Sequence, residues 1–172
     1  FGSFEIHSAM GDYGTLRSLV DFTISNHFEG HDPSSDEGLV RWLNRVAEDT
    51  AAMIAHWERV GFVHGVMNTD NMSIHGITID YGPFGWVEDY DPSWTPNTTD
   101  SNSRRYTFGN QRLVGEWNFA RLLEAVSPLF EEPSNLYRSL EHYRTSFKSH
   151  TEAMWVGKLG LRQSAPSDDE LV

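Results

Sequence analysis

Two short polar stretches, residues 64–71 and 80–82, contain side chains that could bind a divalent cation beside a group able to accept a proton. The first reads His-Gly-Val-Met-Asn-Thr-Asp-Asn and ends in Asp70 and Asn71, and the second reads Asp-Tyr-Gly and begins with Asp80. Carboxylate and amide oxygens are hard ligands, which suit Mg²⁺ or Mn²⁺ better than zinc. The residue types therefore predict a site for one of these cations, provided that the fold brings the two stretches together.

The spacing within the first stretch matches part of a pattern used by kinase-like folds. These folds place Asn seven residues after His, so that one loop supplies both a base to the attacking hydroxyl and an amide oxygen to Mg²⁺. Asn71 stands seven residues after His64, but Val66 occupies the position of the usual base and cannot accept a proton. Asp70 is the nearby carboxylate. Asp80 begins a match to the Asp-Phe-Gly signature, whose Asp binds the metal that bridges nucleotide phosphates.

Each motif taken alone has an ordinary structural explanation, an Asx turn or a polar loop beside a helix. Their combination after a long amphipathic helix, with a short hairpin between them, favours the chemical interpretation. His64 itself is expected to be a structural histidine that holds its loop against the backbone of Asp80 rather than a general base.

Apolar residues that recur every three or four positions predict the helices that must position these stretches. The strongest signal covers residues 36–60. Residues 74–79 resemble a small β-hairpin that leads into the second stretch, and Phe4 and Ile6 alternate with polar neighbours as in a short strand. Residues 88–112 are expected to form a long irregular loop. The remaining helices are predicted at residues 12–27, 115–129 and 134–159, the last with Ser134 as its N-cap.

The composition indicates a single domain, residues 1–172. A hydrophobic fraction of 38% is enough to bury a core, so we expect a mainly α fold with a small β-hairpin, an α+β class. Trp42, Trp57 and Trp117 fall on apolar helix faces and are predicted to lie in that core.

The charge and the residue types also exclude several functions. Because 13 basic residues oppose 25 acidic ones, the net charge is −12, and we expect no nucleic-acid partner. No apolar run approaches the roughly 18 residues that a membrane span needs, so no membrane partner is expected. The absence of cysteine excludes disulfides and thiolate metal sites. With no secretory signal in the sequence, a cytoplasmic location is expected.

The sequence resembles the selenoprotein O family of kinase-like proteins over most of residues 1–160. This resemblance implies a kinase-like fold that binds ATP in a flipped orientation and transfers AMP to hydroxyl side chains of acceptor proteins. It implies that Asp70 accepts the proton, that Asn71 and Asp80 bind Mg²⁺ or Mn²⁺, and that Asp80 also lies near the phosphates of ATP. Bacterial members would be cytoplasmic and eukaryotic ones mitochondrial. The matching motifs are residues 1–5, 64–73, 78–85, 105–106, 110–111 and 117–118.

The sequence also departs from the family pattern. We expect a larger kinase-type lobe truncated at both ends, without the smaller nucleotide-binding lobe, and with the acidic residues 167–170 beginning a further segment. No lysine precedes Lys148, and no glycine-rich loop opens a helix, so we expect the chain alone to bind Mg-ATP poorly and to be inactive. Two alternatives to AMP transfer stay open: a γ-phosphate phosphotransferase and a catalytically dead pseudokinase that serves as a scaffold.

Overall fold

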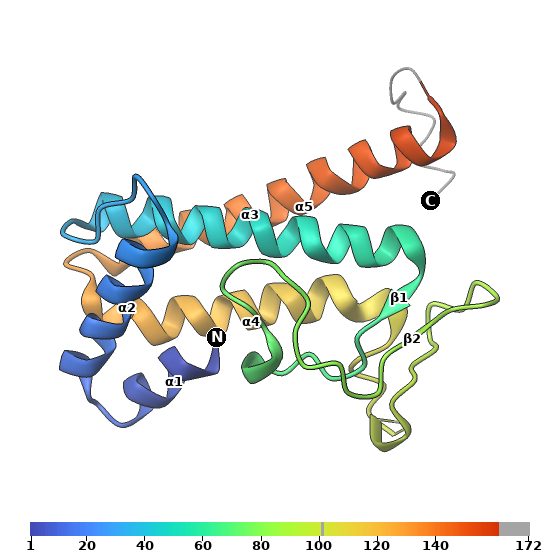
Figure 1. The fold of residues 1–172 in the computed structure, drawn as a ribbon, viewed down its shortest axis with the longest axis horizontal. Helices are drawn as coiled ribbons and strands as arrows, with labels where there is room; N and C mark the ends of the chain where they lie inside the picture. The colour runs from blue at the N-terminus through green and yellow to red at the C-terminus, as the bar shows by residue number, and fades with distance from the viewer. Residues whose placement is uncertain (101, 162–172) are drawn as a thin grey trace.

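The longest helix, α3 (Asp36–Val60), lies between two other long helices in the computed structural model, which describes residues 1–100 and 102–161 (Figure 1). It begins where the Ser35 side chain accepts a hydrogen bond from the Gly38 amide, at 3.2 Å, and it ends at Gly61 in the left-handed conformation. The predicted bounds of this helix are confirmed. It packs most extensively against α5, and also against α4, so it is the central element of the core.

The other helices surround α3 and make the molecule mainly helical, as predicted. Figure 1 shows α1 and α2 covering one end of the three long helices, while α5 extends beyond the other end. No helix within residues 1–100 and 102–161 is long and apolar enough to cross a membrane. The acidic residues 167–170 lie outside the described residues. The bounds are α1 Gly2–Ala9, α2 Tyr13–His27, α4 Gln111–Val126 and α5 Leu136–Leu159.

The segment around Phe4 and Ile6 is helical, so the predicted strand is wrong. Residues two apart lie on one face of a strand but on nearly opposite sides of a helix. Phe4 is buried with its ring centroid 6.0 Å from that of Trp42, whereas Ile6 is 52% exposed. Alternation over five residues is compatible with both structures, and packing against α3 decides for the helix.

The two strands of the structure are not the ones that the sequence predicts. β1 (Phe62–Val63) pairs antiparallel with β2 (Gly85–Trp86). The predicted hairpin at residues 74–79 is reduced to a single antiparallel bridge between Met72 and Thr78. The turn within it packs so closely on α3 that a Cβ added to Gly76 would lie 2.4 Å from the Asp49 carbonyl oxygen. The turn is therefore packed directly against α3.

The boundaries of the last two helices differ from those predicted. α4 begins four residues earlier, because a 3₁₀ turn at Phe108–Asn110 leads directly into it, and the end of the predicted irregular loop is therefore helical. Ser134 lies inside a 3₁₀ turn, Pro133–Asn135, and is not the N-cap of α5. Trp117 is 42% exposed, so its predicted core position is wrong, and the guanidinium groups of Arg105 and Arg121 lie over its ring.

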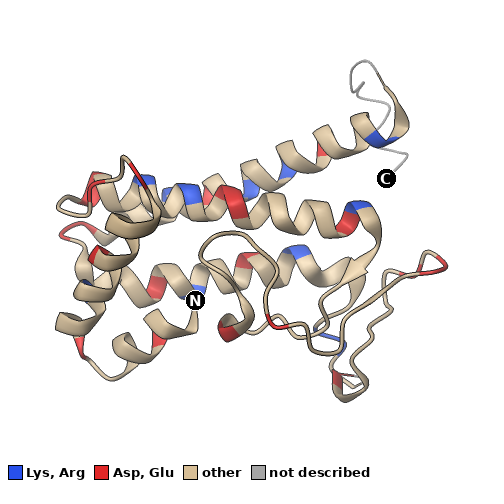
Figure 2. Cartoon of the chain, viewed as in Figure 1, with Lys and Arg blue, Asp and Glu red and all other residues tan. Residues whose placement is uncertain are grey.

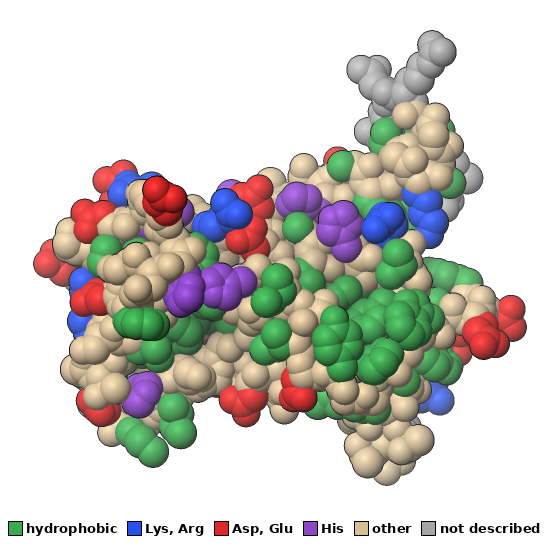
Figure 3. All heavy atoms as spheres, in the orientation of Figure 1, with side chains coloured by type: hydrophobic (Ala, Val, Ile, Leu, Met, Phe, Trp, Pro, Cys, Tyr) green, Lys and Arg blue, Asp and Glu red, His purple; other side chains and the backbone are tan. Residues whose placement is uncertain are grey.

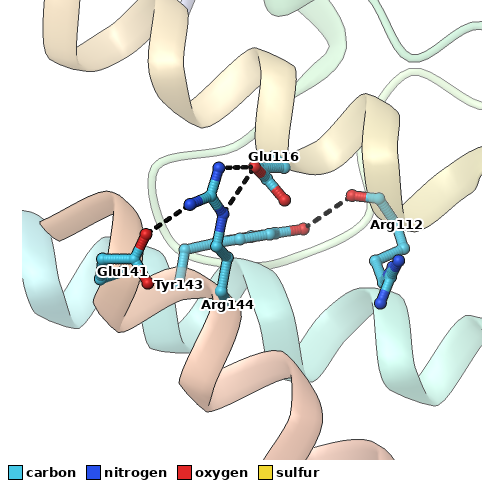
Figure 4. A network of polar contacts seen from close by, with 5 residues as sticks. All are labelled: Arg112, Glu116, Glu141, Tyr143 and Arg144. Atoms are coloured by element: carbon cyan, nitrogen blue, oxygen red, sulfur yellow. Dashed lines mark hydrogen bonds and ion pairs between the residues drawn. The ribbon is translucent and has the colours of Figure 1, made fainter. Parts of the chain in front are cut away.

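Polar contacts join α4 to α5 at the side of the bundle (Figure 4). Arg144 donates two hydrogen bonds to one oxygen of Glu116, at 2.9 and 2.7 Å, and also pairs with Glu141 on its own helix. The hydroxyl of the buried Tyr143 donates to the Arg112 carbonyl oxygen at 3.3 Å. Elsewhere the charged residues are dispersed over the helices and the loops (Figure 2).

Glu58, near the end of α3, is half-buried beside a cavity of about 620 Å³ between the ends of α3 and α5. Burial raises the pKa of Glu58 from 4.5 to about 7, and the nearby Arg112 only partly opposes this effect. Since the pKa is higher in the folded state, the contribution of Glu58 to stability is fully present below pH 4.5 and is lost as the pH rises through 7.

We expect Glu58→Gln to remove this loss, so that the variant is more stable than the parent above pH 7. The difference between the two pKa values corresponds to at most about 3 kcal/mol. Urea titrations below pH 4.5 and above pH 7 measure the free energy of unfolding of the parent and the variant. Glu131→Gln, at an exposed acid, is the matched control. A pH dependence that survives Glu58→Gln unchanged would contradict the prediction.

Candidate functional site

The first polar stretch continues from β1 into a 3₁₀ turn, Thr69–Asn71, that holds two of the predicted site residues. The turn is capped by Asn68, whose side-chain oxygen accepts from the Asn71 amide at 3.2 Å. The Asn71 side chain donates its own amide hydrogen to the Val66 carbonyl oxygen at 2.9 Å. This bond uses the nitrogen of the half-buried side chain and leaves its oxygen as the atom that can coordinate a cation. Asp70 is exposed.

The second stretch turns sharply at Asp80. Its φ of +55° lies in the left-handed region, which non-glycine residues seldom adopt and which is common at functional sites. The turn is closed by the Gly82 amide, which donates to the Asp80 carbonyl oxygen at 2.8 Å. The Asp80 side chain is exposed and forms no hydrogen bond or ion pair with another residue that the structure describes. Both carboxylate oxygens are therefore free for a ligand.

His64 connects the two stretches. Its ring is 1% exposed, and Nε2 donates to the Ile79 carbonyl oxygen at 2.8 Å, while Nδ1 accepts from the Val66 amide at 3.4 Å. The predicted structural role is confirmed, with the contact one residue before Asp80. The segment before Asp80 is also bonded to α3, because the Trp57 indole nitrogen donates to the Thr78 hydroxyl at 2.9 Å. The segments that lead to Asn71 and to Asp80 are thus both held by the buried ring of His64.

Three buried amide side chains that the sequence analysis missed hold the backbone between β1 and the 3₁₀ turn. They come from distant positions in the chain, and the only sequence signal is that two of them lie in the motifs at residues 110–111 and 117–118. Each donates to a carbonyl oxygen at 2.9 Å, which satisfies a backbone group that would otherwise be buried without a partner. The pairs are Gln111 with Phe62, Asn97 with Gly65, and Asn118 with Met67.

Asn97 is itself positioned by the long irregular loop, which is anchored at Asp100. The carboxylate of Asp100 accepts from the backbone amides of Arg105 and Tyr106, at 3.0 and 2.7 Å, and from the Ser103 hydroxyl. Burial opposes ionisation there, but these hydrogen bonds outweigh it and lower the pKa of Asp100. The loop is therefore held by an ionised, hydrogen-bonded acid close to the site.

The start of α1 lies directly against the 3₁₀ turn. The Phe1 nitrogen donates to the carbonyl oxygens of Thr69 and Met72, at 2.9 and 2.7 Å. A Cβ added to Gly2 would lie 1.7 Å from Oδ1 of Asp70, so the carboxylate occupies the space that any other side chain at this position would need. Glycine at position 2 therefore allows the observed orientation of Asp70.

Aromatic rings surround the second stretch. Phe84 lies 5.5 Å from both Tyr81 and Trp86, and 6.0 Å from the buried Phe62, measured between ring centroids. Tyr81 and Trp86 are 61% and 54% exposed. Figure 3 shows apolar side chains gathered into one patch over the region of β1 and β2. Asp80 therefore adjoins an apolar surface rather than a field of charged groups.

Within residues 1–100 and 102–161, no three His, Asp or Glu side chains are grouped as a metal centre. The candidate cation ligands are one amide oxygen, on Asn71, and one carboxylate, on Asp80, with Asp70 beside them on the first turn. Mg²⁺ commonly binds with one or two carboxylates and completes its coordination with water and phosphate oxygens. The chemistry of the donor set fits that cation.

The family described as "Protein adenylyltransferase SelO" matches residues 1–172. The chain is 51% identical to the "Protein nucleotidyltransferase YdiU" of Xanthomonas campestris pv. campestris strain 8004 and 48% identical to that of Flavobacterium johnsoniae. Each match covers 100% of this chain and 33% of the relative, so the chain spans about a third of the length of these relatives. Because the family match extends over the whole sequence, the chain belongs to the SelO family of protein adenylyltransferases.

Proposed function

We propose that this chain is the part of a protein adenylyltransferase that binds the divalent cation and accepts the proton of the acceptor hydroxyl. The observation that supports this most directly is the buried His64, which bonds to Val66, the residue that holds the Asn71 side chain, and to Ile79, the residue before Asp80. Together with the family match, this link makes it reasonable for Asn71 and Asp80 to share one cation. The helical unit then corresponds to the larger lobe of a kinase-like fold.

Two residues would hold the cation, Mg²⁺ or Mn²⁺. The Asn71 amide oxygen is available because its nitrogen is bonded to Val66, and the Asp80 carboxylate has both oxygens free of other described residues. When bound, the cation would neutralise charge on the phosphates of ATP. Asp80, at a sharp exposed turn, would also be the group nearest the phosphates.

Asp70 would accept the proton from a Ser, Thr or Tyr hydroxyl of the acceptor protein. The hydroxyl oxygen forms a bond to the α-phosphorus of ATP as the bond from that phosphorus to pyrophosphate breaks. The products are the AMP-modified acceptor and pyrophosphate, with the proton on Asp70. Because this carboxylate is exposed, a protein-borne hydroxyl can reach it. Val66 cannot serve as the base that ordinary γ-phosphate transfer requires, which favours AMP transfer.

We expect acceptor proteins to become labelled from α-labelled ATP and not from γ-labelled ATP. The assay uses this chain within a protein of the relatives' full length, with Mg²⁺ present. Asp80→Ala should lower transfer at least about 100-fold, because it removes the only carboxylate ligand proposed for the cation. Asp89→Ala, which removes an exposed acid outside both turns, is the matched control. Labelling from the γ-position would indicate a kinase instead, and no labelling would indicate a scaffold.

The isolated chain of 172 residues should bind Mg-ATP weakly and transfer no measurable AMP, because no lysine precedes Lys148 and no glycine-rich loop opens a helix. Calorimetric titration and the α-label assay test this expectation. Robust transfer by the isolated chain would refute it, while leaving the proposed chemistry of the two turns intact.

We also expect Gly2→Ala to lower kcat about tenfold or more, because the added methyl group displaces the Asp70 carboxylate. Gly157→Ala is the matched control: Gly157 lies in α5 with no other atom within 4 Å of an added Cβ. Activity of that control should stay within about twofold of the parent. If Gly2→Ala keeps full activity, the orientation of Asp70 does not matter for the reaction.

A further inference from the structure

Gln111, the first residue of α4, completes the open edge of the segment that leads into the site. Its side chain is 0% exposed, and it forms two hydrogen bonds at once. Nε2 donates to the Phe62 carbonyl oxygen at 2.9 Å, and Oε1 accepts from the His64 amide at 3.0 Å. In an extended chain, the backbone groups of residues two apart lie on the same edge. One amide side chain therefore forms the two hydrogen bonds that a neighbouring strand would form with this edge.

The opposite edge of this segment is already occupied by β2 and the residue after it. Val63 pairs with Gly85, and the Val87 amide donates to the Gly61 carbonyl oxygen at 2.9 Å. The segment is thus held from both sides, by backbone on one edge and by Gln111 on the other. On the Gln111 side, the described residues provide no second strand.

We propose that Gln111 is a positioning residue for AMP transfer, acting through His64. This inference rests on the proposed function. The Gln111 side chain fixes the backbone amide of His64. The ring of His64 in turn holds Val66, whose carbonyl oxygen accepts from the Asn71 side chain, and Ile79, which precedes Asp80. A shift of the His64 backbone moves both turns relative to each other, and with them the two groups that would share the cation.

The role requires an amide in particular. Phe62 needs a donor and His64 needs an acceptor, so both ends of the side chain are used. Asn97 and Asn118 hold single carbonyl oxygens of the same stretch and do not contact His64. Gln111 is therefore the side chain that sets the position of the histidine backbone.

Two substitutions test this requirement in the full-length protein. Gln111→Leu removes both hydrogen bonds at every pH. Gln111→Glu places an ionised oxygen opposite the Phe62 carbonyl oxygen at high pH, but on protonation it regains a donor and an acceptor of nearly the same shape. Because burial raises the pKa of a carboxyl group at this position, protonation becomes accessible as the pH falls.

For both variants we expect kcat to fall about 100-fold at alkaline pH, since a displacement of about 1 Å in reacting groups costs that much. The KM for ATP should stay within about threefold, because no contact with the nucleotide is removed. Relative to the unsubstituted protein at each pH, Gln111→Glu should recover as the pH is lowered and Gln111→Leu should not. All rates are divided by the folded fraction measured by circular dichroism.

Asn110→Asp is the matched control, the same amide-to-acid change one residue earlier. The Asn110 side chain donates to the Arg105 carbonyl oxygen at 2.6 Å and does not contact the segment leading into the site. Its kcat should stay within about twofold of the parent and show no recovery at low pH.

The rate of hydrogen exchange at the His64 amide tests its hydrogen bond to Gln111 independently of enzymatic activity. It should accelerate in Gln111→Leu and not in Asn110→Asp. Unchanged exchange, a kcat that falls only with the folded fraction, or a Gln111→Glu variant that does not recover would each overturn the proposal. If the unsubstituted full-length protein transfers no AMP, the proposed function fails, while the exchange data still decide whether Gln111 holds the histidine.

Discussion

The candidate site depends on one buried imidazole. His64 contacts Val66 with one ring nitrogen and Ile79 with the other, so a single side chain satisfies backbone groups in both of the stretches that carry the candidate ligands. A buried donor or acceptor left without a partner costs about 1–3 kcal/mol, which is a strong reason for both turns to stay where they are. The spatial relation between Asn71 and Asp80 is therefore set by the core rather than by the exposed turns themselves.

The side chains that hold the backbone of the first stretch are neutral. The stretch that leads to Asn71 is held by amide side chains of Gln111, Asn97 and Asn118, each bonded to a backbone carbonyl oxygen. Amides provide donor and acceptor atoms without charge, so they fix the backbone without adding charge beside Asp70 and Asp80. A charged support at the same distance would alter the affinity of the site for a cation.

The parts of this arrangement that were predictable from sequence are those fixed by local signals. The bounds of α3 follow from the apolar periodicity of residues 36–60, and the chemistry of the two turns follows from their residue types. Pairing of β1 with β2 and the contacts of Gln111 join residues more than twenty positions apart, and no periodicity encodes such partners. The helix at Phe4 was missed for a related reason: five residues of alternation do not distinguish a helix from a strand until a packing partner is known.

The negative charge of the chain affects how the proposed enzyme can bind a triphosphate. The chain carries a net charge of −12, and the carboxylates of Asp70 and Asp80 are both exposed at the site. Several of its arginines are already paired with acids on their own helices, as Arg17 is with Asp21. A triphosphate approaching these turns meets like charge, so a divalent cation between the acids and the phosphates is an electrostatic requirement of the proposed reaction. It follows that the relatives' remaining two thirds are where further cationic groups for the phosphates are to be sought.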